Sequence, residues 1–141
     1  MIIEMIDCLT DTQIKDLYEL YQFEWWTKGR QLDDVRRMVQ HTDVIIAFCE
    51  PDTKKLVAFT RILTDYAYKA LVFDVIVATP YRNTGLGRRL MEAVVNHPAL
   101  KAVRHLELYC LPDLVPFYQQ WGFTTELGEL RFMRRVNANV A

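Results

Sequence analysis

Residues 70–90 read ALVFDVIVATPYRNTGLGRRL, an apolar run followed at once by a turn rich in glycine and arginine. The first nine residues are mostly β-branched, aromatic or aliphatic and include one charge, Asp74, as in a buried strand. Leu86 and Leu90 then begin an apolar stripe at the spacing of an α-helix. The stretch therefore predicts a strand, a tight turn and a helix in direct succession, as in an α/β domain.

The sequence before this stretch predicts a strand, two helices and two further strands. Thr10 and Gln13 have the spacing of a capping box, which marks the start of a helix. The apolar stripe that follows reaches Trp25, so we expect this tryptophan to pack in the core and the helix to end near Lys28. The expected elements are a strand at 1–6, helices at 10–28 and 32–39, and strands at 44–48 and 56–63.

The sequence after the stretch predicts a sheet that closes with a hairpin. Pro98 stops the helix that begins at Leu86. The remaining expected elements are a strand at 103–110, a short helix at 112–121 and hairpin strands at 123–125 and 129–136. We therefore expect a single α/β domain over residues 1–141, with one central mixed β-sheet of about seven strands flanked by helices. Because residues 70–78 are apolar almost throughout, we expect this strand in the sheet centre with both faces covered.

Composition argues against several classes of function. With 17 Lys plus Arg against 18 Asp plus Glu, the chain lacks the basic surplus of a nucleic-acid-binding domain, so no nucleic-acid partner is expected. Its three cysteines are far apart and have neither a CxxC pattern nor a histidine at metal spacing, so we expect free thiols in a reducing cytoplasm. There is no signal-peptide pattern and no apolar run of roughly 18 residues, so we expect neither export nor a membrane span.

The turn at residues 82–87 has the features of an anion-binding site. At the start of a helix, backbone N–H groups without partners inside the helix point outward, and the helix dipole favours negative charge there. Gly85 and Gly87 allow a ligand to approach the backbone without interference from a Cβ atom. The turn therefore predicts phosphate binding, although neither GxxxxGK[ST] nor the third glycine of the dinucleotide fingerprint is present.

Together with the sequence FYQQWGF at residues 117–123, this turn resembles the GNAT superfamily of acyl-CoA-dependent N-acyltransferases. The superfamily has a pyrophosphate-binding signature, [RQ]xxGx[GA], after its fourth strand, and a Tyr four residues before a Gly-Phe pair. The matching positions are Arg82, Gly85 and Gly87 for the first motif and Tyr118, Gly122 and Phe123 for the second. The resemblance implies a GNAT-like fold that uses acetyl-CoA as co-substrate and needs no metal.

The resemblance also implies where acetyl-CoA binds. The acyl-pantetheine arm would lie in the gap between the fourth and fifth strands, with a backbone N–H near Val77 polarising the thioester carbonyl. The pyrophosphate would lie on residues 82–88. The expected cofactor-binding residues are Val75, Ile76, Val77, Arg82, Asn83, Thr84, Gly85, Leu86, Gly87 and Arg88.

Two residues are expected to take part in catalysis. The resemblance gives Tyr118 the role of general acid toward the departing thiolate, for which a phenol is a suitable donor, and its alternative is a half-buried core tyrosine bonded to backbone. Asp74 interrupts the most apolar strand, where an unpartnered carboxylate would be costly. It is either a base or an anchor for the substrate ammonium, or else a structural carboxylate bonded to backbone or to an arginine. Glu107 and His105 are second choices for the base.

The segment FEWWTKGR at residues 23–30 carries candidate acceptor-binding residues, because the resemblance implies that the first helix pair forms the acceptor wall. Trp26 lies off the core stripe, and with Tyr66 and Tyr68 it predicts an aromatic cleft suited to an aryl-alkyl amine. Glu24 or Asp65 would bind the ammonium. The expected substrate residues are Trp26, Asp65, Tyr66 and Glu107. A homodimer contact explains the same aromatic residues equally well.

The sequence thus predicts transfer of an acetyl group from acetyl-CoA to a small primary amine, by direct attack in a ternary complex. Three alternatives stay open. The acceptor is a protein N-terminus, a lysine or an aminoacyl-tRNA; or the protein is an acyl-CoA-binding sensor without catalysis; or the glycine turn binds nothing. The presence of Tyr118 argues against the sensor.

Overall fold

The computed structural model describes residues 2–137, which divide after Tyr109 into two compact units. The N-terminal unit holds a sheet and its covering helices, and the C-terminal unit begins at Cys110. The expectation of a single domain over residues 1–141 stays a prediction.

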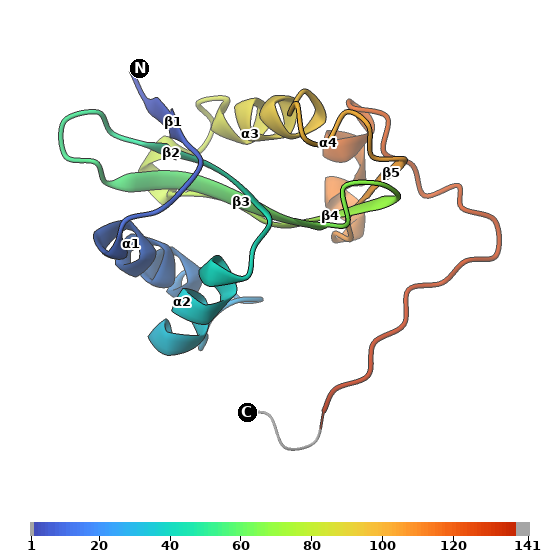
Figure 1. Ribbon diagram of the computed structural model, residues 1–141, viewed down its shortest axis with the longest axis horizontal. Coiled ribbons are helices and arrows are strands. Elements are labelled where there is room, and N and C mark those ends of the chain that lie inside the picture. Colours follow the sequence, from blue (N-terminus) through green and yellow to red (C-terminus); the bar gives the residue numbers. More distant parts are fainter. Residues whose placement is uncertain (1, 138–141) are drawn as a thin grey trace. The chain divides into compact units, whose positions relative to one another are not determined.

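The N-terminal unit is built on a mixed sheet of five strands in the order β1-β2-β3-β4-β5 (Figure 1). Neighbouring strands pair antiparallel from β1 to β4, whereas β5 runs parallel to β4. The strands are β1 (Glu4–Ile6), β2 (Val44–Cys49), β3 (Leu56–Thr64), β4 (Lys69–Val77) and β5 (His105–Glu107). The predicted mixed α/β architecture is confirmed, although about seven strands were expected and five are found in the described part of the chain.

Helices cover both faces of this sheet (Figure 1). The first two, α1 (Asp11–Gln22) and α2 (Leu32–Gln40), lie on one face, and α3 (Leu86–Val95) lies on the other. The capping box at the start of α1 is confirmed, because the Gln13 backbone N–H donates to the Thr10 hydroxyl at 3.1 Å and the Thr10 backbone N–H donates to the Gln13 side chain at 3.0 Å. A short 3₁₀ turn, η1 (Thr79–Tyr81), connects β4 toward α3.

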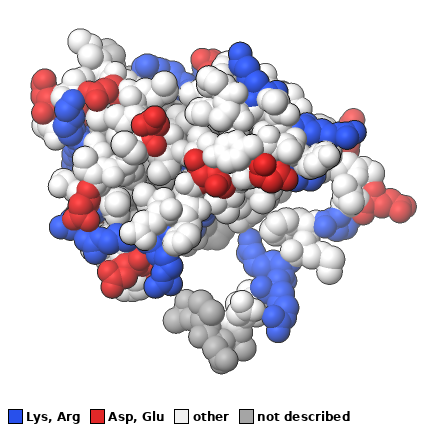
Figure 2. Space-filling model, in the orientation of Figure 1, with Lys and Arg blue, Asp and Glu red and all other residues white. Residues whose placement is uncertain are grey.

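One face of the N-terminal unit mixes charges of both signs. Figure 2 shows acidic and basic side chains interspersed over this face of the unit, without a continuous basic field. Of the helices in residues 2–137, none is long and apolar enough to cross a membrane.

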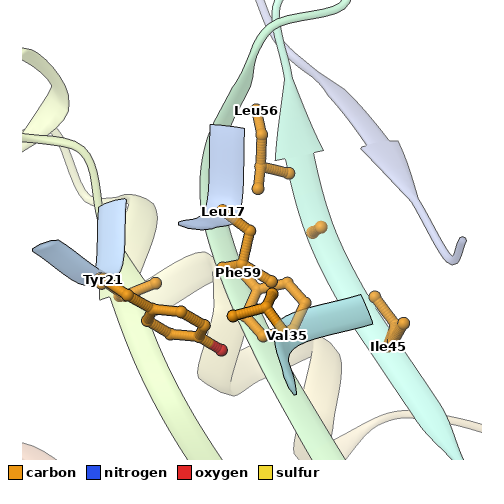
Figure 3. Packing of buried hydrophobic residues seen from close by; sticks show 8 residues of the cluster. Leu17, Tyr21, Val35, Ile45, Leu56 and Phe59 are labelled. Carbon is orange, nitrogen blue, oxygen red and sulfur yellow. The ribbon is translucent and has the colours of Figure 1, made fainter. Parts of the chain in front are cut away.

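One core cluster joins α1 and α2 to the sheet (Figure 3). Its members are Leu17, Tyr21, Val35, Ile45, Ala47, Leu56, Phe59 and Ile76. Full burial of such a side chain contributes about 1.5–3 kcal/mol. Tyr21 sits at the border of this cluster and directs its hydroxyl toward β4, where it bonds to Asp74. The core therefore fixes a polar group next to the middle of β4.

The first helix is shorter than predicted, and Trp25 is not in the core. Helix α1 ends at Gln22, and Trp25 is 73% exposed. The Gln22 side chain donates to the Arg30 carbonyl and accepts from the Gly29 N–H, while the buried Thr27 hydroxyl donates to the Tyr21 carbonyl at 2.8 Å. These local bonds replace further helical turns and fold residues 23–30 into a compact connection.

The expectation that residues 70–78 lie in the sheet centre with both faces covered is met only in part. Strand β4 lies next to the short β5, and its side chains alternate between buried and more exposed positions. The strand predicted at 103–110 is reduced to His105–Glu107, so it covers little of the neighbouring edge. Some apolar side chains of β4 are therefore not fully buried in this unit.

The C-terminal unit contains η2 (Pro112–Leu114) and α4 (Val115–Gln119). The predicted hairpin at 123–125 and 129–136 is not found, because none of these described residues is in a strand. An alternating pattern gives only a preference for extended backbone, and a strand also needs a partner for its ladder of hydrogen bonds.

Candidate active site

Within residues 2–109, the edge of β4 that faces β5 is without a strand partner over most of its length, and we call this part the open edge. Strand β5 pairs with Lys69, Ala70 and Leu71 and with no later residue of β4. Within residues 2–109, the edge from Val72 to Val77 therefore has no strand partner on this side. The gap expected between the fourth and fifth strands stays a prediction, and the pairing of the two strands ends at Leu71 of β4.

Backbone donors of β4 point into this open edge. The Ala78 N–H donates to the Val57 carbonyl at 2.8 Å, which makes these two residues a hydrogen-bonded pair of the antiparallel ladder. Because the ladder alternates, Val77 directs its N–H and C=O away from β3 and toward the open edge. Ile76 faces β3 opposite Phe59, and Val75, one residue earlier in the extended strand, faces the same way as Val77. Two N–H groups are thus available to an extended ligand.

A β-bulge interrupts β4 just before these donors. Arg61 lies opposite Phe73 and Phe59 opposite Ile76, so Asp74 and Val75 together face a single residue of β3. Asp74 has φ +56°, a left-handed conformation that residues other than glycine seldom adopt. The bulge bends β4 at the point where the outward N–H groups of Val75 and Val77 begin.

The glycine turn leads from the end of this edge into the N-terminus of α3. Gly85 is the N-cap with φ +86°, a Cβ atom there would meet open space, and no side chain caps the helix. The first helical bond runs from the Arg89 N–H to the Gly85 carbonyl, so the N–H groups of Leu86 and Gly87 have no partner inside the helix. These groups and the helix dipole make the turn suited to an anion.

Arg82, the first arginine of the turn, is held in place on two sides. Its Nε donates to the Val77 carbonyl at 3.2 Å, and its Nη2 forms an ion pair with Glu24 of the α1–α2 connection. Upstream in the turn, the Tyr81 hydroxyl donates to Glu50 at 2.6 Å. The turn is therefore fastened both to the open edge and to two other loops.

Asp74 lies at the centre of a buried charge cluster. Its Oδ2 accepts from Arg61 Nε at 2.7 Å, from the Tyr21 hydroxyl at 2.9 Å and from Arg30 Nη1 at 3.0 Å. The Asp74 side chain is 4% exposed. Three donors from α1, β3 and the α1–α2 connection thus meet on one oxygen of β4.

The cluster keeps Asp74 ionised. Burial alone would raise the pKa of this carboxyl, but the positive charges of Arg61 and Arg30 and their hydrogen bonds outweigh it, and the net pKa is lowered. Burial and the negative charge of Asp74 raise the pKa of Tyr21 well above its usual value. Asp74 is thus a carboxylate bound to arginines, which is the structural alternative for this residue.

Tyr118 is placed on α4 in the C-terminal unit and is 9% exposed. Phe117 and Phe123 contact its ring edge-to-face. Burial, with a smaller effect of Cys110, raises the pKa of Tyr118 to about 12. Among the described residues its hydroxyl makes no hydrogen bond to backbone or side chain, and the raised pKa keeps the phenol protonated at neutral pH.

The residues predicted for the acceptor lie on three separate elements. Trp26 is on the α1–α2 connection and is 41% exposed. Asp65 accepts from the backbone N–H groups of residues 67–69, which lower its pKa and tie it to the β3–β4 turn that also holds Tyr66. Glu107 on β5 forms an ion pair with Lys69 at 3.0 Å.

Sequence reasoning did not find Arg30, Arg61 and Tyr21 as partners of Asp74. A signal existed for one of them, because Arg61 interrupts the apolar run of residues 56–63 just as Asp74 interrupts that of residues 70–78. Opposite charges in two successive apolar strands favour pairing across a ladder.

Known proteins with a similar sequence include several named N-acetyltransferases. The chain is 29% identical over 120 residues to an uncharacterized N-acetyltransferase ycf52 of Porphyra purpurea, covering 82% of this chain and 68% of that protein. It is 33% identical over 106 residues to serotonin N-acetyltransferase 2, chloroplastic, of Oryza sativa subsp. japonica, covering 74% of this chain and 53% of that protein. The chain thus spans about half to two thirds of the length of these relatives.

Solved structures of the same fold cover nearly the whole chain. A GNAT-family protein from Xanthomonas campestris pv. campestris has a TM-score of 0.82 at 28% identity, covering 97% of this chain and 94% of that one. An acetyltransferase structure from Deinococcus radiodurans R1 has a TM-score of 0.75 at 25% identity, covering 94% and 88%. The sequence profile of the Acetyltransferase (GNAT) family matches residues 10–123. The chain therefore belongs to the GNAT acetyltransferase family.

Proposed function

We propose that this protein transfers the acetyl group of acetyl-CoA to the primary amine of a small molecule, in a ternary complex. One observation carries the proposal: the open edge of β4 is followed, after η1 and the glycine turn, by the uncapped N-terminus of α3. Such an arrangement suits a long ligand with a carbonyl at one end and a pyrophosphate at the other, because each end meets backbone donors.

The residues of this track fit acetyl-CoA by the chemistry of their donors. Val75 and Val77 offer outward N–H groups to the acyl-pantetheine arm, and Leu86 and Gly87 offer theirs to the pyrophosphate. The open space at Gly85 leaves room for the phosphates beside the backbone. When bound, acetyl-CoA supplies an activated acyl group as a thioester.

We assign Tyr118 the role of the proton donor to the leaving thiolate. The amine nitrogen forms a bond to the acyl carbon as the carbon–sulfur bond breaks, and the leaving sulfur accepts the phenol proton. The amine loses one proton to solvent, which returns a proton to the phenolate. A pKa of about 12 keeps Tyr118 protonated at neutral pH and thus able to donate.

We assign Asp74 a structural role. Three donors on its Oδ2 and a lowered pKa support this choice, because a carboxylate so stabilised is a poor proton acceptor. It would instead hold Arg30 and Arg61 at the bulge of β4.

The exposed aromatic residues support an aryl-alkyl amine as the acceptor. Trp26 and Tyr66 are 41% and 50% exposed, and both lie on connections next to the sheet. Exposed aromatic faces suit an aryl-alkyl amine. The 33% identity to a protein named serotonin N-acetyltransferase supports the same class. The near balance of 17 Lys plus Arg against 18 Asp plus Glu argues against a tRNA acceptor, which would require a basic surplus.

Calorimetric titration of acetyl-CoA into the protein tests this proposal. We expect micromolar affinity for the wild type and at least a tenfold loss in Gly85→Trp, whose side chain would occupy the turn. Gly128→Trp is the matched control, because Gly128 also has a positive φ, +65°, but lies in the C-terminal unit. We expect its affinity to equal that of the wild type.

Measurement of turnover distinguishes an acetyltransferase from an acyl-CoA-binding sensor and from a turn that binds nothing. Release of free CoA thiol with an aryl-alkyl amine such as tryptamine or with another small amine would support transfer. Binding of acetyl-CoA without turnover on any amine, peptide or aminoacyl-tRNA would favour the sensor, and no binding at all would leave the glycine turn as structure only.

A further inference from the structure

The cluster at Asp74 carries more positive than negative charge. Arg30 and Arg61 both pair with this one carboxylate, and both pairs use the same oxygen. Tyr21, the third partner, is neutral because its pKa is raised. Two guanidinium groups therefore share a single anionic partner, and one positive charge is left without a counterion within the cluster.

Both guanidinium groups are held rigidly. Arg30 lies over the ring of Tyr21 at 4.6 Å from its centroid, and Arg61 lies over the ring of Phe73 at 4.7 Å. Stacking on a ring and pairing with a carboxylate fix the plane of each side chain before any ligand arrives. Little rotamer entropy remains to be lost on binding.

Arg61 keeps most of its donors free for a ligand. Among the hydrogen bonds of residues 2–137, its side chain takes part in the one from Nε to Asp74. Its side chain is 13% exposed and that of Arg30 is 32% exposed, so solvent reaches both. Two Nη groups in a partly buried position form a fork suited to a carboxylate or a phosphate.

The cluster lies next to the proposed site of acyl transfer. Asp74 directly precedes Val75, the first residue whose N–H faces the open edge, and both belong to the bulge. The residue that holds both arginines and the first residue of the open edge are therefore neighbours in β4, with Cα atoms about 3.8 Å apart.

We propose that the acceptor amine carries an acidic group, a carboxylate or a phosphate, which binds the Nη groups of Arg61 with support from Arg30. This inference rests on the proposed function and names its substrate class. An acid group supplies the missing negative charge, whereas the ammonium of a simple amine would be repelled by the two arginines. An α-amino acid or an amino-alkyl phosphate fits, and Asp74 then acts as the positioning residue of the pair.

Binding of matched pairs of compounds tests the inference without requiring turnover. Tryptophan and tryptamine differ by a carboxylate, and O-phosphoethanolamine and ethanolamine differ by a phosphate. Each is titrated by calorimetry into the protein saturated with CoA. We expect the acidic member of at least one pair to bind at least tenfold more tightly, and the pair that responds identifies the acid group.

Variants of the two arginines test whether the preference for the acidic compounds depends on the cluster. Arg61→Gln should reduce the preference to less than twofold, and Arg61→Lys should retain part of it, because it keeps the charge and loses the fork. Arg30→Gln, at the more exposed position, gives a second variant if Arg61→Gln fails to fold. Arg36→Gln is the matched control, since Arg36 pairs with Asp11 and Asp33 on the helical surface. It should leave the preference unchanged.

The outcomes separate this inference from the proposed function. Equal or tighter binding of the neutral amines by the wild type overturns it, and so does a preference that survives in both glutamine variants. Turnover of neutral amines alone would overturn it while leaving acetyl transfer intact. An arginine-dependent preference for acids without any turnover would support the acid-binding site and count against the proposed transfer.

Discussion

Arg82 of the glycine turn forms an ion pair with Glu24, 58 residues earlier in the chain. This pair joins the α1–α2 connection to the turn proposed to bind pyrophosphate. The same connection is fastened to β4 through Arg30 and Asp74. Residues 24–30 thus contact both ends of the proposed acyl-CoA track. Substitutions in this connection should therefore change the affinity for acetyl-CoA.

Glu24→Gln is expected to increase the affinity for acetyl-CoA about twofold to fivefold. A phosphate must compete with Glu24 for Arg82, and a partly exposed ion pair of this kind contributes up to about 1 kcal/mol. Calorimetric titration measures the change. Glu19→Gln, which removes the same charge from an exposed position on α1, should leave the affinity unchanged. Weaker binding in Glu24→Gln would mean that the pair holds Arg82 in its binding position.

Asp74→Asn is expected to lower the free energy of unfolding by about 3 kcal/mol at pH 7, because Arg30 and Arg61 lose their shared anion. Urea unfolding of both proteins measures the difference.

The difference between wild type and Asp74→Asn should depend on pH. The folded pKa of Asp74 is lowered, so its contribution is fully present above the unfolded value near about 3.9 and is lost as pH falls through the folded pKa. The two proteins should therefore approach each other in stability below about pH 4. A difference that is constant from pH 7 to pH 3 would contradict the ionised cluster.

Tyr118→Phe is expected to lower kcat about 100-fold and to leave the affinity for acetyl-CoA unchanged, because the variant removes a proton donor and keeps the ring. With a pKa of about 12, Tyr118 should produce no decline in the rate of the wild type below about pH 11. Tyr18→Phe on α1 is the control and should keep full activity. Full activity of Tyr118→Phe would assign this tyrosine to packing alone.

Trp26→Ala is expected to raise KM for an acceptor with an aromatic ring about threefold to tenfold, with little change for an aliphatic acceptor. An aromatic contact contributes about 0.5–1.5 kcal/mol. Trp25→Ala is the matched control, since Trp25 is the neighbouring tryptophan and is 73% exposed. Equal effects of the two substitutions on KM would argue against an acceptor contact by Trp26.

The parts of the fold that depend on local sequence were predicted well. The strand, turn and helix of residues 70–90 follow from apolar periodicity, and the turn at Gly85 needs a conformation that glycine adopts freely. The capping box at Thr10 is equally local. These features depend on residues within a few positions of one another, so the sequence pattern contains them.

The parts that depend on distant residues were not predicted. Trp25 was expected in the core, but side-chain bonds of Gln22 and Thr27 to the backbone end α1 before it. The open edge of β4 depends on how few residues of β5 pair with it. Asp74 was known to need a partner, but the meeting of Arg30 and Arg61 on one oxygen requires both the bulge and the fold of the α1–α2 connection.

The central claim is that the open edge of β4 and the N-terminus of α3 together bind acetyl-CoA. The most direct test is a titration of ¹⁵N-labelled protein with acetyl-CoA, followed through backbone amide resonances. We predict that the amides of Val75, Val77 and residues 86–88 shift together and saturate at one ligand equivalent. Amides on this track that do not respond, while others elsewhere do, would contradict the account.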